Sequence, residues 1–298
     1  MIHFTLRQIE YFMAAVEHRG AVAAAKAMNV SQPSISHAIG ELEALWGERL
    51  FTRVPSRGLE LTSAGKRRYR AARELMQRAA QLGARDTESV VGDLSVGCFA
   101  TLGARHLPPI IRQFQAGFPD VKLSIIEGDT EELVERVERG TLDLALIYDM
   151  DLARQVALYP VGEQTPYALL PEDHPLARKK ALKMADLAGE PFILLDMPHS
   201  RDYFLSLFRQ AGVTPTVSLE LRSVEMIRSL VASGHGVSIL VTRPVGDLSY
   251  DGRPIACRSF DSAVPAQRVV VAASQASALS RPAAVFLDVM RNRFMKSK

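Results

Sequence analysis

The hydrophobic pattern of the chain changes near Gly92, and this change limits the folds that the sequence can adopt. Before this point the apolar residues recur at the spacing of helices; after it, apolar runs typical of strands alternate with helical stretches. Elements that alternate in this way form a parallel sheet with right-handed crossover connections. The first of them are a strand at 94–99, a helix at 108–118, a strand at 121–127, a helix at 130–139 and a strand at 142–148. We therefore predict an α/β body behind a helical amino-terminal segment.

The α/β body is long enough for two lobes. We predict further strands at 167–170, 191–195, 217–221, 237–241 and 268–273, and helices at 202–211, 224–232 and 282–294. The last strand and helix are expected to return to the first lobe. The predicted domains are a small helical domain at 1–62, a long connecting helix at 63–91 and an α/β domain at 92–298, with lobe I at about 92–162 and 267–298 and lobe II at about 163–266.

The amino-terminal segment contains three short helices followed by a hairpin. Thr5 with Gln8 forms a capping-box pattern, and Ser31 is placed to cap the third helix, which Gly47 ends. Val54 to Gly58 carries turn residues between two apolar pieces, which predicts a β-hairpin. The stretch from Ser63 to about Arg85 is a long helix with small residues along one side, which favours a dimer seam over a cofactor site.

Charge is distributed unevenly along the chain. Residues 1–88 hold 13 Lys+Arg and 9 Asp+Glu, and residues 89–298 hold 23 and 24. A basic amino end on a nearly neutral body indicates a polyanionic partner, although ordinary scatter could produce the same imbalance. The chain has no transmembrane stretch and no signal peptide, so we expect no membrane partner. Its two cysteines fit a reducing cytoplasm.

The second and third short helices are joined by the tight turn from Met28 to Ser31, which suits a helix-turn-helix. The second helix of such a motif enters the major groove of double-stranded DNA. Its exposed face would display short polar groups that can read base edges or bind phosphates: Gln32, Ser34, Ser36 and His37. The alternative is a helical hairpin with no partner.

These residues resemble a family, the LysR-type transcriptional regulators. The match runs from Ala24 to His37 (AAKAMNVSQPSISH) and continues with Leu50 to Arg53 (LFTR), Leu61 to Gly65 (LTSAG), Leu142 to Leu146 (LDLAL) and Leu230 to Val237 (LVASGHGV). The resemblance covers essentially the whole chain and is more specific in its amino-terminal half. It implies a winged helix-turn-helix, a linker helix that dimerises and a two-lobed effector domain resembling periplasmic binding proteins.

The resemblance also implies partners and site residues. Family members are homodimers or homotetramers whose small-molecule effector changes how they bend DNA and contact RNA polymerase. Carried over position by position, the DNA-binding residues are Gln32, Pro33, Ser34, Ser36, His37 and the wing arginine Arg53. Arg57 is added as a nearby basic residue on physical grounds rather than by a match.

The chain departs from the family pattern in two places. Ala21 and Ala23 replace hydroxyl residues at the start of the second helix, which removes a cap worth about 1 kcal/mol and a phosphate contact. Ser31 to Glu48 contains no Lys or Arg. The electrostatic attraction must then come from Arg53, Arg57 and the basic cluster of the linker helix, and we expect DNA binding to depend only weakly on salt.

A two-lobed α/β body binds ligands between its lobes, where strands end and helices begin. The candidate effector-binding residues at such junctions are Phe99, Ala100, Thr101, Gly128, Asp129, Thr130, Tyr148, Asp149, Pro198, His199, Ser200, Arg201, Ser223 and Val224. Hydroxyls at helix starts favour a carboxylate-bearing effector. Thr130 and Ser223 could instead simply cap their helices, and His199 and Arg201 could lie in a surface loop.

Other functions lack the residues that they need. The chain has no Gly-x-Ser-x-Gly, no phosphate-binding loop and no metal-ligand spacing, so we expect no enzyme, no metal and no cofactor. Cys98 and Cys257 are far apart in sequence and are expected to be small core residues, although a redox role for Cys98 stays open. The alternative function is a solute-binding ligand carrier, which would leave residues 1–91 without a role.

Overall fold

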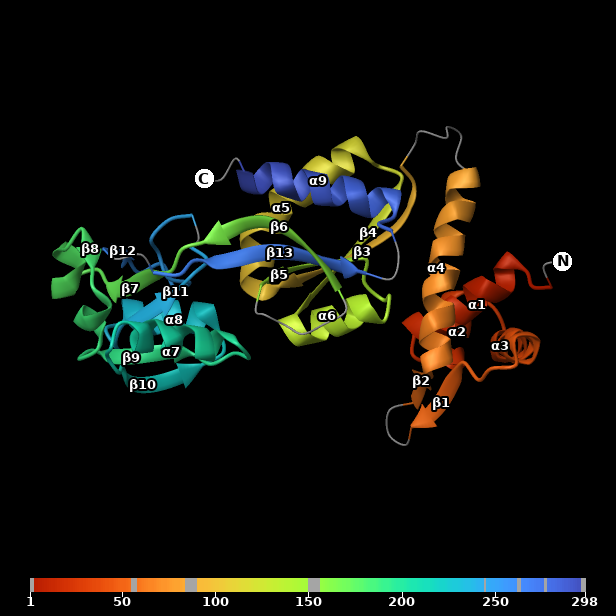
Figure 1. The fold of residues 1–298 in the computed structure, drawn as a ribbon, viewed down its shortest axis with the longest axis horizontal. Helices are drawn as coiled ribbons and strands as arrows, with labels where there is room; N and C mark the ends of the chain where they lie inside the picture. The colour runs from red at the N-terminus through yellow and green to blue at the C-terminus, as the bar shows by residue number, and fades with distance from the viewer. Residues whose placement is uncertain are drawn as a thin grey trace.

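The computed structural model describes residues 3–54, 58–83, 90–149, 156–243, 245–261, 264–275 and 278–295. The amino-terminal domain lies at one end, a long helix stands between it and the α/β body, and the two lobes follow one after the other (Figure 1). None of the described helices is long and apolar enough to span a membrane.

Three helices form the amino-terminal domain: α1 (Leu6–Glu17), α2 (Ala21–Ala27) and α3 (Gln32–Trp46). The predicted caps are present. Thr5 and Gln8 form a reciprocal capping box, Ser31 accepts a hydrogen bond from the Ser34 N–H, and Gly47 ends α3 in the left-handed conformation. The wing is an antiparallel hairpin of β1 (Phe51–Val54) and β2 (Gly58–Leu61), in which Phe51 pairs with Leu61.

The linker helix α4 (Ser63–Gly83) belongs to the same core as α1 and the wing. Tyr69 is buried against Phe12. Gly65 lies directly on the Leu50 carbonyl, since a Cβ at this position would sit 2.1 Å from that oxygen. The first turns of α4 therefore belong to the amino-terminal domain, and its later turns extend from that domain to the α/β body.

Lobe I is a five-stranded sheet with helices on both faces. The strand order is β4 (Val121–Gly128), β3 (Gly92–Phe99), β5 (Leu144–Tyr148), β13 (Gln267–Ser274) and β6 (Val156–Gln164). β3 runs parallel to β4 and β5, whereas β13 runs antiparallel to both β5 and β6. Helices α5 (Ala100–Gly117) and α9 (Arg281–Met295) cover one face, and α6 (Thr130–Glu138) covers the other (Figure 1).

Lobe II contains two groups of strands. β11 (Ser238–Leu240), β7 (Tyr167–Pro171), β12 (Ile255–Phe260) and β8 (Ala181–Leu182) form one sheet, and β9 (Pro191–Leu195) pairs in parallel with β10 (Thr216–Leu221). A bridge between Phe192 and Val237 joins the two groups. Helices α7 (Ser200–Gln210) and α8 (Val224–Ala232) and the short 3₁₀ helices at Pro175–Arg178 and Met184–Leu187 complete the lobe.

One helix differs from its prediction. The sequence indicated a start at Pro108, but α5 begins at Ala100 and contains Pro108 and Pro109 in its interior. Proline removes backbone hydrogen bonds inside a helix. Here the helix continues because Leu102, Leu107 and Ile110 are all buried along its length. Strands β6, β8 and β12 were not predicted from the sequence.

Candidate nucleic-acid interface and interlobe cleft

One face of α3 packs in the domain core, and the other is open to solvent. Ile35, Ala38, Ile39 and Leu42 are buried. The predicted DNA-binding residues of this helix are all exposed: Gln32, Pro33, Ser34, Ser36 and His37. Some of these side chains hydrogen-bond along the helix surface: the Gln32 Nε2 donates to the Ser36 hydroxyl at 2.7 Å, and the hydroxyls of Ser31 and Ser34 lie 2.8 Å apart. The exposed face of α3 thus presents a short row of hydrogen-bonding groups.

An acidic residue lies beside this row. The His37 Nε2 is 3.2 Å from the Glu41 carboxylate, which also accepts a hydrogen bond from Gln8 at 2.7 Å. The His37 side chain is 77% exposed, so its ring remains accessible. A carboxylate one turn along the helix opposes the approach of phosphates. The exposed face of α3 therefore contributes hydrogen bonds rather than positive charge.

Two basic residues of α4 are engaged near the end of α3, at Glu48. Glu48 accepts hydrogen bonds from both Arg67 and Arg68, and these bonds hold the pKa of the Glu48 carboxyl below its ordinary value. The Arg68 guanidinium also lies over the Trp46 ring, 4.6 Å from its centroid. Arg53 lies in β1, where its backbone pairs with Leu59, and Arg57 lies outside the described residues.

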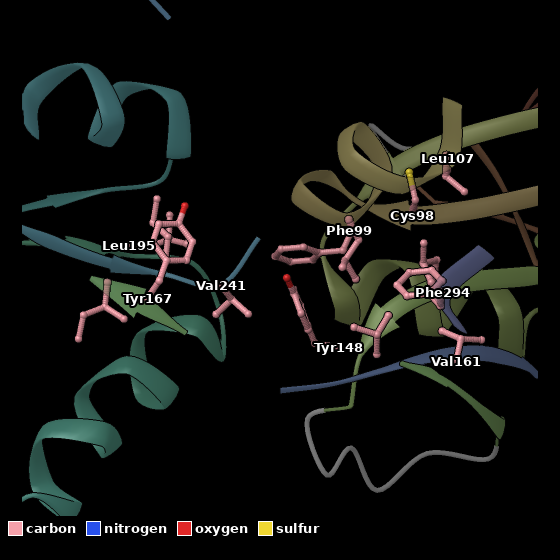
Figure 2. Close-up of a cluster of buried hydrophobic side chains, with 14 of the residues drawn as sticks. Cys98, Phe99, Leu107, Tyr148, Val161, Tyr167, Leu195, Val241 and Phe294 are labelled. Atoms are coloured by element: carbon pink, nitrogen blue, oxygen red, sulfur yellow. The ribbon is translucent and has the colours of Figure 1, made fainter. Parts of the chain in front are cut away.

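A pocket lies between the two lobes, as the junction rule predicted. Its volume is about 300 Å³, which includes space open to solvent. The lining comes from both lobes and consists of Phe99, Thr101, Tyr148, Leu195, Ser200, Phe204, Val224, Leu240, Val241, Thr242 and Gln267. Figure 2 shows Phe99 and Tyr148 together at the edge of lobe I, opposite Leu195 and Val241 of lobe II; the centroids of the two rings are 5.6 Å apart.

A cluster of hydroxyl groups gives this largely apolar pocket its polar part. The Tyr148 hydroxyl lies 2.6 Å from that of Thr242, which in turn lies 3.5 Å from that of Thr101. Burial raises the pKa of Tyr148, so its phenol stays neutral and can donate a hydrogen bond. Because Thr242 follows β11 in lobe II, the hydroxyl cluster also joins the two lobes.

Five of the predicted effector-binding residues line the pocket: Phe99, Thr101, Tyr148, Ser200 and Val224. Ala100 begins α5 between two of them. The pocket residues that the sequence reading missed are Leu195, Phe204, Leu240, Val241, Thr242 and Gln267. Thr242 follows the end of β11, so the same junction rule could have found it. The missed apolar residues carry no pattern that separates them from core residues.

The other predicted residues lie outside the pocket lining, and Asp129, Ser223 and Asp149 have structural partners there. Asp129 caps α6 by accepting from the Glu132 N–H at 2.9 Å, Gly128 precedes this cap, and Thr130 is buried. Ser223 caps α8 by accepting from the Met226 N–H. The capping role that the sequence left open is therefore present for Ser223, whereas α6 is capped by Asp129 and not by Thr130, its first residue. Asp149 pairs with Arg268 at 2.6 Å.

The residues around the start of α7 contact both lobes and include one residue with strained backbone. Arg201 pairs with Asp196 at 3.1 Å and with Glu220 at 2.8 Å, so its charge is engaged within lobe II. The His199 Nε2 lies 3.1 Å from the Glu131 carboxylate of lobe I. His199 has φ 64°, and the Ser200 N–H donates across it to the Pro198 carbonyl at 2.8 Å. This three-residue turn is rare for a side-chain-bearing residue, and it places Ser200 at the pocket and His199 across the cleft.

No group of three or more His, Cys, Asp or Glu residues that could hold a metal ion occurs within the part of the chain that the structure describes. Cys98 and Cys257 are both buried, one in β3 of lobe I and the other in β12 of lobe II. Burial raises the pKa of each thiol to about 11. Neither is a reactive thiolate at neutral pH.

Comparisons with known proteins agree with this geometry. Residues 6–66 match the family model described as "Bacterial regulatory helix-turn-helix protein, lysR family", and residues 87–295 match "LysR substrate binding domain". The chain is similar to HinK, a LysR family transcriptional regulator from Pseudomonas aeruginosa, with a TM-score of 0.69 and 36% identity over 99% of this chain and 100% of that one. A substituted form of full-length OxyR from the same organism gives a TM-score of 0.75 at 27% identity, over 97% and 98% of the two chains. A curated relative from Pectobacterium carotovorum, "Hydrogen peroxide-inducible genes activator", is 30% identical over 239 residues, 79% of each chain.

Proposed function

Because this chain belongs to the LysR family of transcriptional regulators, we propose that α3 reads operator DNA and that a small organic acid bound in the interlobe pocket changes how the protein holds that DNA. The regulator has an amino-terminal helix-turn-helix and a carboxy-terminal effector-binding domain. A ligand carrier without a DNA role is not favoured, since the helix-turn-helix model covers residues 6–66. The single observation that carries the effector part is a pocket that both lobes build together.

We assign base-edge and phosphate contacts to the exposed row on α3: Gln32, Pro33, Ser34, Ser36 and His37. Gln and Ser side chains donate to and accept from base edges in the major groove. Arg53 and Arg57 are assigned to the backbone beside the wing. Glu41 and the ion pairs of Glu48 reduce the net positive charge of this surface. We therefore expect a shallow salt dependence of DNA affinity, and a log–log slope near about −8 would contradict this account.

We assign the effector to the class of small acids with an apolar body. The rings of Phe99 and Tyr148 and the aliphatic side chains opposite them suit the body, and the hydroxyl cluster suits the acid group. The lining contains no Lys, Arg or His. An acid in this pocket would therefore be held by hydroxyl groups and by the starts of α5, α7 and α8 rather than by an ion pair.

The peroxide response in a relative's name is not proposed for this chain. Cysteine senses peroxide as an exposed thiolate with a low pKa. The sequence has two cysteines, both buried in different lobes and both with raised pKa. We infer that this regulator responds to a bound molecule instead.

We also propose the assembly and the mode of action. The chain acts as a dimer or a dimer of dimers on DNA in the cytoplasm, contacts RNA polymerase from there, and works by binding rather than by catalysis. Support comes from the family membership and from α4, whose small residues at helical spacing permit close approach of a second helix.

The proposal is tested by fluorescence anisotropy with a duplex from upstream of the gene and a random duplex of equal length. The upstream duplex should bind at least about 10³-fold more tightly. Small acids that change this affinity are then titrated against Thr242→Val and Ser200→Ala, which should weaken the response, and against Ser206→Ala as a control on α7 outside the pocket lining. Equal affinity for both duplexes, with and without the acids, would refute the proposed function.

A further inference from the structure

A second cavity lies at the other end of lobe I, where the linker helix meets the α/β body. Its volume is about 490 Å³, part of it open to solvent, against about 300 Å³ for the interlobe pocket. Its walls come from α4, from the turn between α6 and β5, and from the connection of β13 to α9. β5 begins beside this cavity and ends at Tyr148 in the interlobe pocket, so the two sites lie at opposite ends of one strand. Figure 1 shows α4 standing along this end of lobe I.

Arg70, a half-buried residue of α4, lines this cavity and has one unpartnered buried donor. Its Nε is completely buried and has no hydrogen-bond partner. No hydrogen bond or ion pair joins its guanidinium to the described residues. Its hydrocarbon stem is held against Gly140, because a Cβ there would sit 2.3 Å from the Arg70 Cγ. A buried N–H donor without an acceptor is costly, and an oxyanion is the acceptor that best suits a guanidinium.

The neighbouring charges do not supply that partner. Asp143 is engaged, since one carboxylate oxygen accepts from Arg73 at 2.6 Å and from the Ser95 N–H at 2.8 Å. Glu74 lies four residues from Arg70 on the same helix and also lines the cavity. No ion pair joins Glu74 to Arg70 among the contacts of the described residues. The start of α9 forms part of the wall through Ser280, whose hydroxyl accepts from the Ala283 N–H.

We propose that this cavity is a second ligand site, separate from the interlobe pocket, in which the Arg70 guanidinium binds an oxyanion: a carboxylate or phosphate group of a small molecule. The guanidinium fork matches both groups. A ligand in this position would touch α4 and lobe I at once. Its binding therefore strengthens the attachment of the DNA-reading end to the effector domain.

The test is a titration of the full-length protein with inorganic phosphate and, separately, with acetate, followed by thermal unfolding. Sodium chloride at equal ionic strength serves as the blank. The better ligand shows which oxyanion the site prefers. Arg70→Met should weaken its binding by about tenfold or more, the factor that corresponds to a lost hydrogen bond to a charged group. Arg78→Met removes the same charge from an exposed position of α4 outside the cavity lining and should leave binding unchanged.

A second variant is expected to bind the anion more tightly, a result that a folding defect would not produce. Glu74→Gln removes the negative charge from the cavity wall and should tighten oxyanion binding. Thr242→Val alters only the interlobe pocket and should leave this binding unchanged. The site is refuted if neither anion stabilises the protein beyond the chloride blank, or if Arg70→Met and Arg78→Met lose the stabilisation equally. Loss of the response in Thr242→Val would assign the anion to the interlobe pocket instead.

Discussion

The contact between Arg73 and Asp143 joins the linker helix to lobe I, and we expect it to contribute strongly to the stability of the whole chain. The two side chains are only 13% and 12% exposed. Arg73 donates to the Asp143 carboxylate and to the Gly140 carbonyl, both at 2.6 Å. Removing one partner of a buried pair leaves the other charge unpaired and costs about 3–5 kcal/mol. Since this pair retains slight exposure, we expect Arg73→Met to lower the free energy of unfolding by about 3 kcal/mol.

The loss should depend on Asp143, which a double-mutant cycle measures. Arg73→Met, Asp143→Asn and the double variant are unfolded in urea, and the transition is followed by the fluorescence of Trp46, the only tryptophan. Trp46 packs against the same core that holds Tyr69 of α4. We expect a coupling energy of about 2 kcal/mol or more. The control cycle uses Arg136 and Glu132, a surface pair on α6, and should give about 0.5 kcal/mol.

Two results would refute this reasoning. A coupling energy for Arg73 and Asp143 no larger than that of the α6 control would show that the contact is worth no more than a surface pair. A loss in Arg73→Met that persists unchanged in the Asp143→Asn background would place the stabilisation in the Gly140 carbonyl bond alone.

Three further outcomes follow from buried groups. Burial first, and then the charges of Arg105 and Arg293, lower the pKa of His106 from 6.5 to about 4, so the unfolded chain takes up a proton at a higher pH than the folded chain does. The free energy of unfolding should therefore be about 2 kcal/mol lower at pH 5 than at pH 7.5. Urea unfolding at a series of pH values measures this dependence, and His106→Gln should flatten it. Cys98 and Cys257 should react with a thiol reagent only after denaturation, and rapid labelling of the native protein would contradict their burial. Gly65→Ala should lower the melting temperature by several degrees, because the added Cβ meets the Leu50 carbonyl, whereas Gly40→Ala, with open space around it, should not.

The elements that the sequence predicted well are those whose ends carry local chemistry. Thr5, Ser31 and Gly47 mark helix boundaries through contacts within a few residues, and these contacts form as expected. α5 was misplaced because Pro108 is a local signal for a helix start, whereas the helix is held by the burial of an apolar face that includes Leu102. β6 was missed although it begins with four apolar residues, because Pro160 interrupts this run and proline within a strand is confined to edge strands such as this one.

About half of the residues that line the interlobe pocket could be predicted, because they too stand at the ends of helices and strands. The junction rule locates residues that follow strands or begin helices, and it found Phe99, Tyr148 and Ser200. It also selected caps such as Asp129, because a hydroxyl or carboxylate at a helix start looks the same in sequence whether it meets a ligand or its own backbone. The cavity beside Arg70 was not predictable, since it depends on how α4 docks against lobe I, between residues far apart in the chain.

The position of Asp143 shows how the interlobe pocket and the DNA-reading end can influence each other. Asp143 immediately precedes β5 and binds the Ser95 N–H of β3, so it ties together the two strands that end at Tyr148 and Phe99. A ligand that changes the contact of Tyr148 with Thr242 acts on the carboxyl end of β5. At the other end of this strand, Arg73 of α4 binds Asp143. Coupling between two sites requires an element that both of them bias. If β5 is that element, Arg73→Met keeps the affinity for the effector but loses the effect of the effector on DNA affinity; an undiminished effect would show that the signal takes another route.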